Sequence, residues 1–119
     1  MKTLIALSLI SFNTFGALTM TDVAGSYEIT HPALPVSNIV TLKANGSISL
    51  SENSPFGTFN CEGQATLTDE LLTSEVTCDN GATFTQEIDL TGVTIADTFE
   101  APVYSSLYQA QVVMTFTKL

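Results

Sequence analysis

The chain has 119 residues, of which twelve are acidic and only three are basic, so its formal net charge is −9 at neutral pH. All three basic residues are lysines, and this shortage of cationic groups argues against nucleic acids and anionic membrane surfaces as partners. A basic protein or divalent cations remain compatible with the charge.

The N-terminal residues resemble a secretory signal peptide. Lys2 precedes an apolar run from Leu4 to Phe15, and small residues follow at Gly16 and Ala17. We expect residues 1–17 to be removed on export to a secreted or periplasmic location. The mature domain, residues 18–119, would then be monomeric, without a membrane span, and would carry two lysines against twelve acidic residues, a net charge of −10.

The mature chain has the pattern of β-strands almost throughout. Apolar residues recur at every second position, and Thr, Val, Ile and Phe dominate the periodic segments. Turn signals recur about every ten residues, as in all-β sandwiches and barrels. This pattern predicts eight strands, each antiparallel to the next, over residues 25–30, 38–43, 47–51, 58–68, 71–78, 82–91, 98–104 and 107–118.

Two Asn-Gly turns indicate the register of their hairpins. A three-residue loop with Gly46 in a left-handed conformation places Leu42 opposite Ile48, so that the apolar faces coincide. The turn that contains Gly81 follows the same logic. Both glycines are therefore predicted to have positive φ.

The two cysteines come into register across a tight turn at residues 69–70. This turn places Leu67 opposite Leu72 and, in the same register, Cys61 opposite Cys78. In an exported chain such a pair predicts a disulfide. Closing a loop of this length stabilises the fold by about 3 kcal/mol in the chain-entropy model.

The last hairpin and the apolar face complete the predicted fold. A short turn at Ser105 and Ser106 would pair Val103 with Tyr108. No helix is available to cover the single apolar face, so we expect an all-β, eight-stranded, antiparallel up-and-down barrel that closes on itself. A two-sheet β-sandwich is the alternative.

The opening tripeptide Gly25-Ser26-Tyr27 and the late Lys118 resemble the lipocalin and wider calycin group of barrels. Members of that group carry Gly-x-Trp on the first strand and a basic residue near the end that packs over the aromatic ring. Tyr27 takes the place of the Trp, since this chain contains no Trp. The resemblance implies carriage of a small ligand inside the barrel.

Residues that support catalysis are scarce. His31 is the only histidine and lies in a proline-rich connection, and both cysteines are assigned to the disulfide. Glu87 and Asp89 share an outward strand face, where solvation is a simpler explanation than cation binding. No nucleophile, zinc or phosphate-loop motif is present, so we expect no enzyme activity, no cofactor and no metal.

The inward face has a small and polar middle. The pairings place Ala65, Ser74 and Gln86 in one row, where the Gln86 amide is costly to bury without a partner. In one interpretation these small residues leave a hollow lumen, in which a ligand is oriented by Gln86, Ser74, Tyr27 or Tyr108. In the other, the small residues accommodate large neighbours, and Gln86 bonds Ser74 or a buried water.

Apolar side chains in the connections are candidate partner contacts. The candidate contact residues are Leu34, Val36 and Phe56. We expect the longer connections to share one end of the barrel, the preferred mouth, which would comprise residues 31–37, 52–57, 69–70 and 91–97.

The combined features predict an exported binding protein without catalytic activity. The first hypothesis is that the barrel carries a small apolar ligand in its lumen. The alternative is a protein-binding barrel that inhibits a basic secreted or host enzyme. Small exported lysozyme inhibitors are the analogy, and the charge of −10 would suit a basic target.

Overall fold

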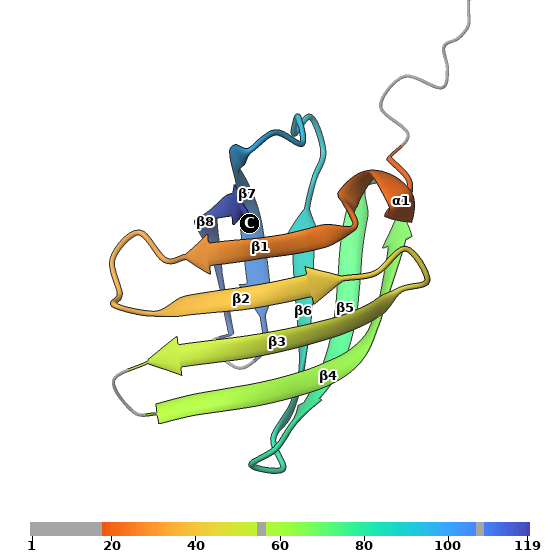
Figure 1. The fold of residues 1–119 in the computed structure, drawn as a ribbon. Helices are drawn as coiled ribbons and strands as arrows, with labels where there is room; N and C mark the ends of the chain where they lie inside the picture. The colour runs from red at the N-terminus through yellow and green to blue at the C-terminus, as the bar shows by residue number, and fades with distance from the viewer. Residues whose placement is uncertain (1–17, 55–56, 107–108) are drawn as a thin grey trace, which may run out of the picture.

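The computed structural model describes residues 18–54, 57–106 and 109–119, which form one short helix and eight strands (Figure 1). The predicted signal peptide lies outside the described residues. The elements are α1 (Met20–Val23), β1 (Gly25–Thr30), β2 (Ser37–Leu42), β3 (Ser47–Ser54), β4 (Gly57–Thr68), β5 (Leu71–Cys78), β6 (Thr83–Asp89), β7 (Thr98–Ser105) and β8 (Ala110–Lys118).

The strands form a closed barrel in sequence order, and β8 pairs with β1 to complete it. All neighbouring pairs are antiparallel. In Figure 1, β1–β4 cross in front of β5–β8 at a steep angle. Closure covers the single apolar face and pairs the two terminal strands, which would otherwise be edges. The predicted up-and-down barrel is confirmed, and the sandwich alternative is not.

The inward face of the wall forms the hydrophobic core. Burial alternates along the strands: in β5, Leu72, Ser74 and Val76 are buried and the residues between them are more exposed. This alternation is the one predicted from the sequence. Four apolar residues on the inward face are only half-buried, namely Phe59, Leu67, Phe99 and Val112.

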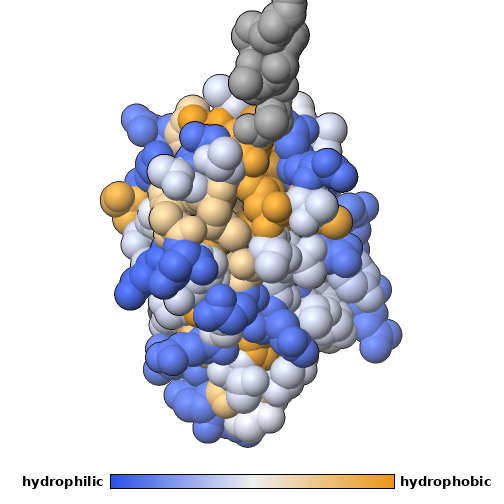
Figure 2. Space-filling model, turned by 90° about the vertical axis from the view of Figure 1, so that its right-hand side faces the viewer, coloured by the Kyte–Doolittle hydropathy of each residue, from blue (hydrophilic) through white to orange (hydrophobic). Residues whose placement is uncertain are grey.

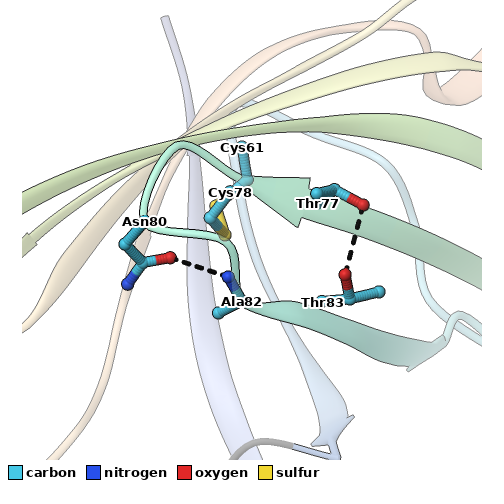
Figure 3. The surroundings of a disulfide bond; sticks show 6 residues. All are labelled: Cys61, Thr77, Cys78, Asn80, Ala82 and Thr83. Carbon is cyan, nitrogen blue, oxygen red and sulfur yellow. Dashed lines mark hydrogen bonds between the residues drawn. A yellow bond between two sulfur atoms is a disulfide. The ribbon is translucent and has the colours of Figure 1, made fainter.

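The two Asn-Gly turns share one backbone form. Gly46 has φ 94° and Gly81 has φ 88°, as predicted. The side-chain oxygens of Asn45 and Asn80 each accept the backbone N–H two residues later, at 2.9 and 3.0 Å (Figure 3 shows the second turn). The registers of β2 with β3 and of β5 with β6 are accordingly those predicted.

The disulfide joins β4 and β5. Cys61 and Cys78 are register partners with Cα atoms 3.8 Å apart, and their sulfurs are bonded (Figure 3). Both side chains are buried. The turn that aligns them has positive φ at Asp69 and Glu70, the backbone form of a two-residue hairpin that matches strand twist. The predicted pairing is confirmed.

The last hairpin departs from its predicted register by four residues. Val103 pairs with Val112 instead of Tyr108. The connection is longer than the predicted two-residue turn, and Gln109, at φ 55°, donates its N–H to Ser105 O at 2.8 Å. A shift by an even number of residues keeps every side chain on its own face, so the alternation pattern cannot distinguish the two registers.

Helix α1 is absent from the sequence prediction. Thr19 caps it: Asp22 N donates to Thr19 Oγ1 at 3.3 Å, and Thr19 N donates to the Asp22 carboxylate at 2.8 Å. The hydrogen bond from the Thr19 backbone, with one from its hydroxyl, lowers the pKa of Asp22. Val23 is buried in the core, so α1 covers one end of the barrel, which we name the helix end.

The direction of the strands decides which connections share an end. The connections after β2, β4 and β6 lie at the helix end, and those after β1, β3, β5 and β7 lie at the opposite end, which we name the loop end. Leu90 N donates to Glu70 O at 2.8 Å, which joins two helix-end connections. The predicted grouping of residues 69–70 and 91–97 with 31–37 is wrong. Each strand takes the chain to the other end of the barrel. Connections 69–70 and 91–97 follow an even number of strands and lie at the helix end, whereas connection 31–37 follows one strand and lies at the loop end.

Candidate functional site

A pocket of about 170 Å³ lies at the loop end. Thr30, the last residue of β1, pairs with Thr115, so the first half of β8 extends beyond β1. The connection 31–36 lies beside this overhang and forms one wall of the pocket. Among the described residues, the lining comprises His31, Leu34, Val36, Asn38, Val103, Ser105, Ala110, Val112 and Met114.

One row of side chains that are small, apart from Gln86, runs across the wall toward the pocket. The predicted row of Ala65, Ser74 and Gln86 is present as register partners on β4, β5 and β6. The observed pairings extend it to Ser105 and Ala110 on β7 and β8, and both of these line the pocket. Since protein interiors are otherwise densely packed, small residues at this level leave space that larger ones would fill.

Asn38 is a polar pocket residue that the sequence analysis missed. It points inward with Val40 and Leu42 on β2, and only 8% of its surface is exposed. Its Oδ1 is buried and has no hydrogen-bond partner among the described residues. An unsatisfied buried acceptor costs roughly 1–3 kcal/mol. Counting back by two from Val40 within the predicted strand would have placed Asn38 on the inward face.

His31 shapes the connection that covers the pocket. Its Nδ1 accepts the backbone N–H groups of Ala33 at 3.0 Å and Leu34 at 3.1 Å. Two backbone donors thus point at Nδ1, which is the accepting nitrogen of the ring. Leu34 lines the pocket and is also 49% exposed, so this connection separates the pocket from solvent.

Two of the predicted lumen residues are tyrosines. Tyr27 lies at the helix end, where its hydroxyl donates to Val23 O at 2.7 Å and burial raises its pKa. Its ring packs edge-on against Phe99 and Phe116 at centroid distances of 5.9 and 6.4 Å. Tyr27 is therefore bonded to α1 and does not line the pocket at the loop end, but it lines a smaller interior cavity together with Gln86. Tyr108 lies outside the described residues.

Gln86 and Ser74, the other predicted lumen residues, lie deeper in the barrel. Gln86 is half-buried and lines a separate cavity of about 30 Å³, together with core residues such as Leu72 and Ile88. Ser74 is buried beside it as its register partner. A space of this size holds roughly one or two water molecules. The larger space lies at the loop end, away from Gln86.

The predicted partner-contact residues lie near the pocket where they are described. Leu34 and Val36 both line it, and Phe56 lies outside the described residues. The same two side chains border a shallow groove on the outer side of the connection, which continues to Asn53 on β3. One short connection thus contributes to an interior pocket and to the outer surface.

The outward carboxylates on β6 have a local structural role. Glu87 is exposed, and Asp89 Oδ1 accepts the backbone N–H of Thr91 at 3.0 Å. The Thr91 hydroxyl and this N–H lower the pKa of Asp89. Nowhere in the described ranges do three or more His, Cys, Asp or Glu side chains gather as a possible metal site.

The residues that resemble the lipocalin group meet at the helix end. Tyr27 and Lys118 are register partners on β1 and β8. A β-carbon placed on Gly25 would lie 3.8 Å from Lys118 Cε and 3.9 Å from Tyr27 Cζ. Both side chains thus converge on Gly25, an arrangement compatible with the first-strand motif of that group.

The side of the molecule that carries α1 has both apolar and polar surface. Figure 2 shows this side, with orange and tan surface in its upper middle and blue or white surface over most of the lower part and the margins. Large apolar residues that are exposed within the described ranges belong to different elements, namely Leu34, Ile39, Leu71, Tyr104, Val113 and Leu119.

Two comparisons of the sequence with known proteins find no match. A scan against models of protein families finds none that matches the chain, and a search of curated proteins finds no significant match. Within the described residues, no helix has the length and apolar character needed to cross a membrane. Functional inference therefore depends on the geometry of the pocket.

Proposed function

We propose that this chain is an exported, non-catalytic binding protein that carries a small, mainly apolar ligand in the pocket at the loop end. The observation that supports this proposal is a pocket of about 170 Å³ with walls formed largely by Leu34, Val36, Val103, Val112 and Met114. An apolar cavity of about 150 Å³ engineered in another protein binds benzene. By that comparison, the ligand would have about six to ten non-hydrogen atoms.

The proposal includes a secreted or periplasmic location. The bond between Cys61 and Cys78 supports it, because disulfides persist mainly in oxidising compartments. The signal-peptide pattern of residues 1–17 points the same way. The lipocalin-like arrangement of Gly25, Tyr27 and Lys118 also agrees with a carrier, since ligand carriage is the common activity of that group.

Titration of the purified protein with toluene, followed by NMR, tests the proposal. Two neighbouring substitutions locate the site. Val112→Phe would fill the pocket. Val113→Phe is the control, because Val113 is 51% exposed and lies on the opposite face of β8. We expect saturable shifts in the wild type and in Val113→Phe, and at least about tenfold weaker binding in Val112→Phe. If the wild type shows no saturable binding, the proposal is wrong.

A protein-binding barrel that inhibits a basic enzyme is the second candidate. Two observations favour it: the net charge of −9 and the exposed Leu34 at the loop end. Attraction of this kind weakens as salt is added. Native mass spectrometry separates the candidates, because a co-purified small mass supports the carrier and a salt-sensitive complex with a basic protein such as lysozyme supports the inhibitor.

A further inference from the structure

The connection 31–36 joins β1 to β2 at the loop end (Figure 1) and depends on one side chain for its shape. His31 Nδ1 accepts the backbone N–H groups of Ala33 at 3.0 Å and Leu34 at 3.1 Å. In the described part of the chain, neither of these N–H groups donates to a backbone carbonyl. The imidazole ring is therefore the group that folds this connection back on itself.

This turn determines where one wall of the pocket lies. Leu34 lines the pocket, and so does His31. Pro32 and Pro35 have fixed φ angles, so the conformational freedom of the connection is concentrated in the two residues between them. The opposite wall belongs to β7 and β8, which are paired with each other. Loss of the two hydrogen bonds would therefore release Leu34 and open the pocket on the side of the connection.

Protonation of His31 removes the acceptor on which this turn depends. A neutral imidazole has one accepting nitrogen, whereas an imidazolium ion donates from both nitrogens and accepts at neither. The proton on Nδ1 would then face the N–H groups of Ala33 and Leu34, which brings three donors together without an acceptor. Histidine is the side chain that ordinarily changes charge between pH 5 and 8, and His31 is the only histidine of the chain.

Other titratable groups lie on the strands around the connection. Within the described residues, β2 has none, and β8 has only Lys118, at the helix end. The titratable residues of β1, β3 and β7 are Tyr27, Glu28, Glu52, Glu100 and Tyr104. Among these, Glu52 shares the inward face of the sheet with Asn38, its register partner. Carboxylates ordinarily titrate at about pH 4 and tyrosines at about pH 10, outside the range of histidine.

From these contacts, and resting on the proposed function, we infer that His31 is a positioning residue that makes ligand binding depend on pH. With a neutral ring, the turn holds Leu34 over the pocket and the ligand is bound. With a protonated ring, the turn opens and the ligand is released. The affinity is therefore highest at and above neutral pH, and it falls as the pH decreases toward about 5.

Titration of toluene at about pH 7.5 and about pH 5 tests the inference, because toluene itself does not change charge. The matched variant is His31→Asn. An asparagine Oδ1 lies two bonds from Cβ, as the imidazole Nδ1 does, and it accepts backbone N–H groups in the turns of Asn45 and Asn80, but it does not titrate. Glu52→Gln is the second control, because it removes the Glu52 carboxylate from the inward face.

We expect toluene to bind the wild type and Glu52→Gln about tenfold more weakly at the lower pH, the effect of losing two hydrogen bonds of ordinary net strength. For His31→Asn, the ratio of the two affinities should remain close to one, whatever the absolute affinity. The inference fails if the wild-type affinity is the same at both pH values, if His31→Asn shows the same loss, or if Glu52→Gln abolishes it. In each of these cases toluene still binds at neutral pH, so the carrier proposal stands.

A second measurement uses the wild type alone and covers the case in which His31→Asn does not fold. In ¹⁵N-labelled protein without ligand, the amide protons of Ala33 and Leu34 should shift upfield as the pH falls, because their hydrogen bonds are lost. Their midpoint should be that of the His31 ring signals. Amide protons that do not move while the ring titrates contradict the inference. If toluene does not bind the wild type at either pH, the proposed function itself is wrong and the inference falls with it.

Discussion

The two turn glycines share a backbone conformation but differ in their surroundings. Positive φ strains any other residue by roughly 1–3 kcal/mol, and both Gly46 and Gly81 have it. A β-carbon on Gly46 would also lie 2.8 Å from Ala65 O, whereas nothing lies within 4 Å of one on Gly81. The Gly46 carbonyl moreover accepts the Ala65 N–H at 2.8 Å, so this turn is packed against β4.

We therefore expect Gly46→Ala to lower the free energy of unfolding more than Gly81→Ala. Backbone strain alone should cost Gly81→Ala about 1–2 kcal/mol. Gly46→Ala should lose about 1 kcal/mol more, because the Ala65 carbonyl must move. Equilibrium urea denaturation of both variants measures the difference. Equal losses would show that packing against β4 does not contribute.

Among the strand pairs, β4 and β5 are joined by a covalent bond as well as by a ladder of hydrogen bonds. Replacing both cysteines with alanine should lower the free energy of unfolding by about 3 kcal/mol, because the crosslink, at a sequence separation of 17, no longer restricts the unfolded chain. Urea denaturation of the double variant, with the oxidised wild type as reference, tests this. Neither cysteine lines the pocket, so toluene affinity should not change.

Registers were predictable where the turn residues constrain the backbone. Gly46 and Gly81 each supply a positive φ, and the predicted pairings on both sides of these turns are confirmed. Ser105 and Ser106 impose no such constraint, and the β7–β8 register differs by four residues. Several registers keep the apolar faces of two strands together. The turn residues then decide which of these registers forms.

In the molecule as a whole, the small cavity beside Gln86, which we name the central cavity, is separate from the pocket at the loop end. Gln86 lines the cavity of about 30 Å³ and is not among the residues of the pocket. We expect Gln86→Leu to maintain or raise the free energy of unfolding, because it replaces a half-buried amide with an apolar side chain. Calorimetric unfolding measures this effect, and the toluene titration should give an unchanged affinity.

The opposite result for Gln86→Leu would revise the location of the site. If the variant remains folded but binds toluene several-fold more weakly, the central cavity and the pocket act as one space. The hollow-lumen interpretation of the row around Gln86 would then apply, and Ser74 would become a candidate ligand contact. Unchanged binding confines the site to the loop end.

The sequence by itself determined the strands, the inward faces, two turn registers and the disulfide. These features depend on a period of two residues and on the backbone preferences of a few turn residues, which are local properties. Tertiary structure alone decided the β7–β8 register, the capping of one end by α1 and the position of the pocket. The pocket lies where β8 extends beyond β1 and the connection 31–36 covers Asn38. That site depends on how β1 and β8 pair when the barrel closes. The length by which β8 extends beyond β1 is set by this pairing, and no local pattern in either strand predicts it.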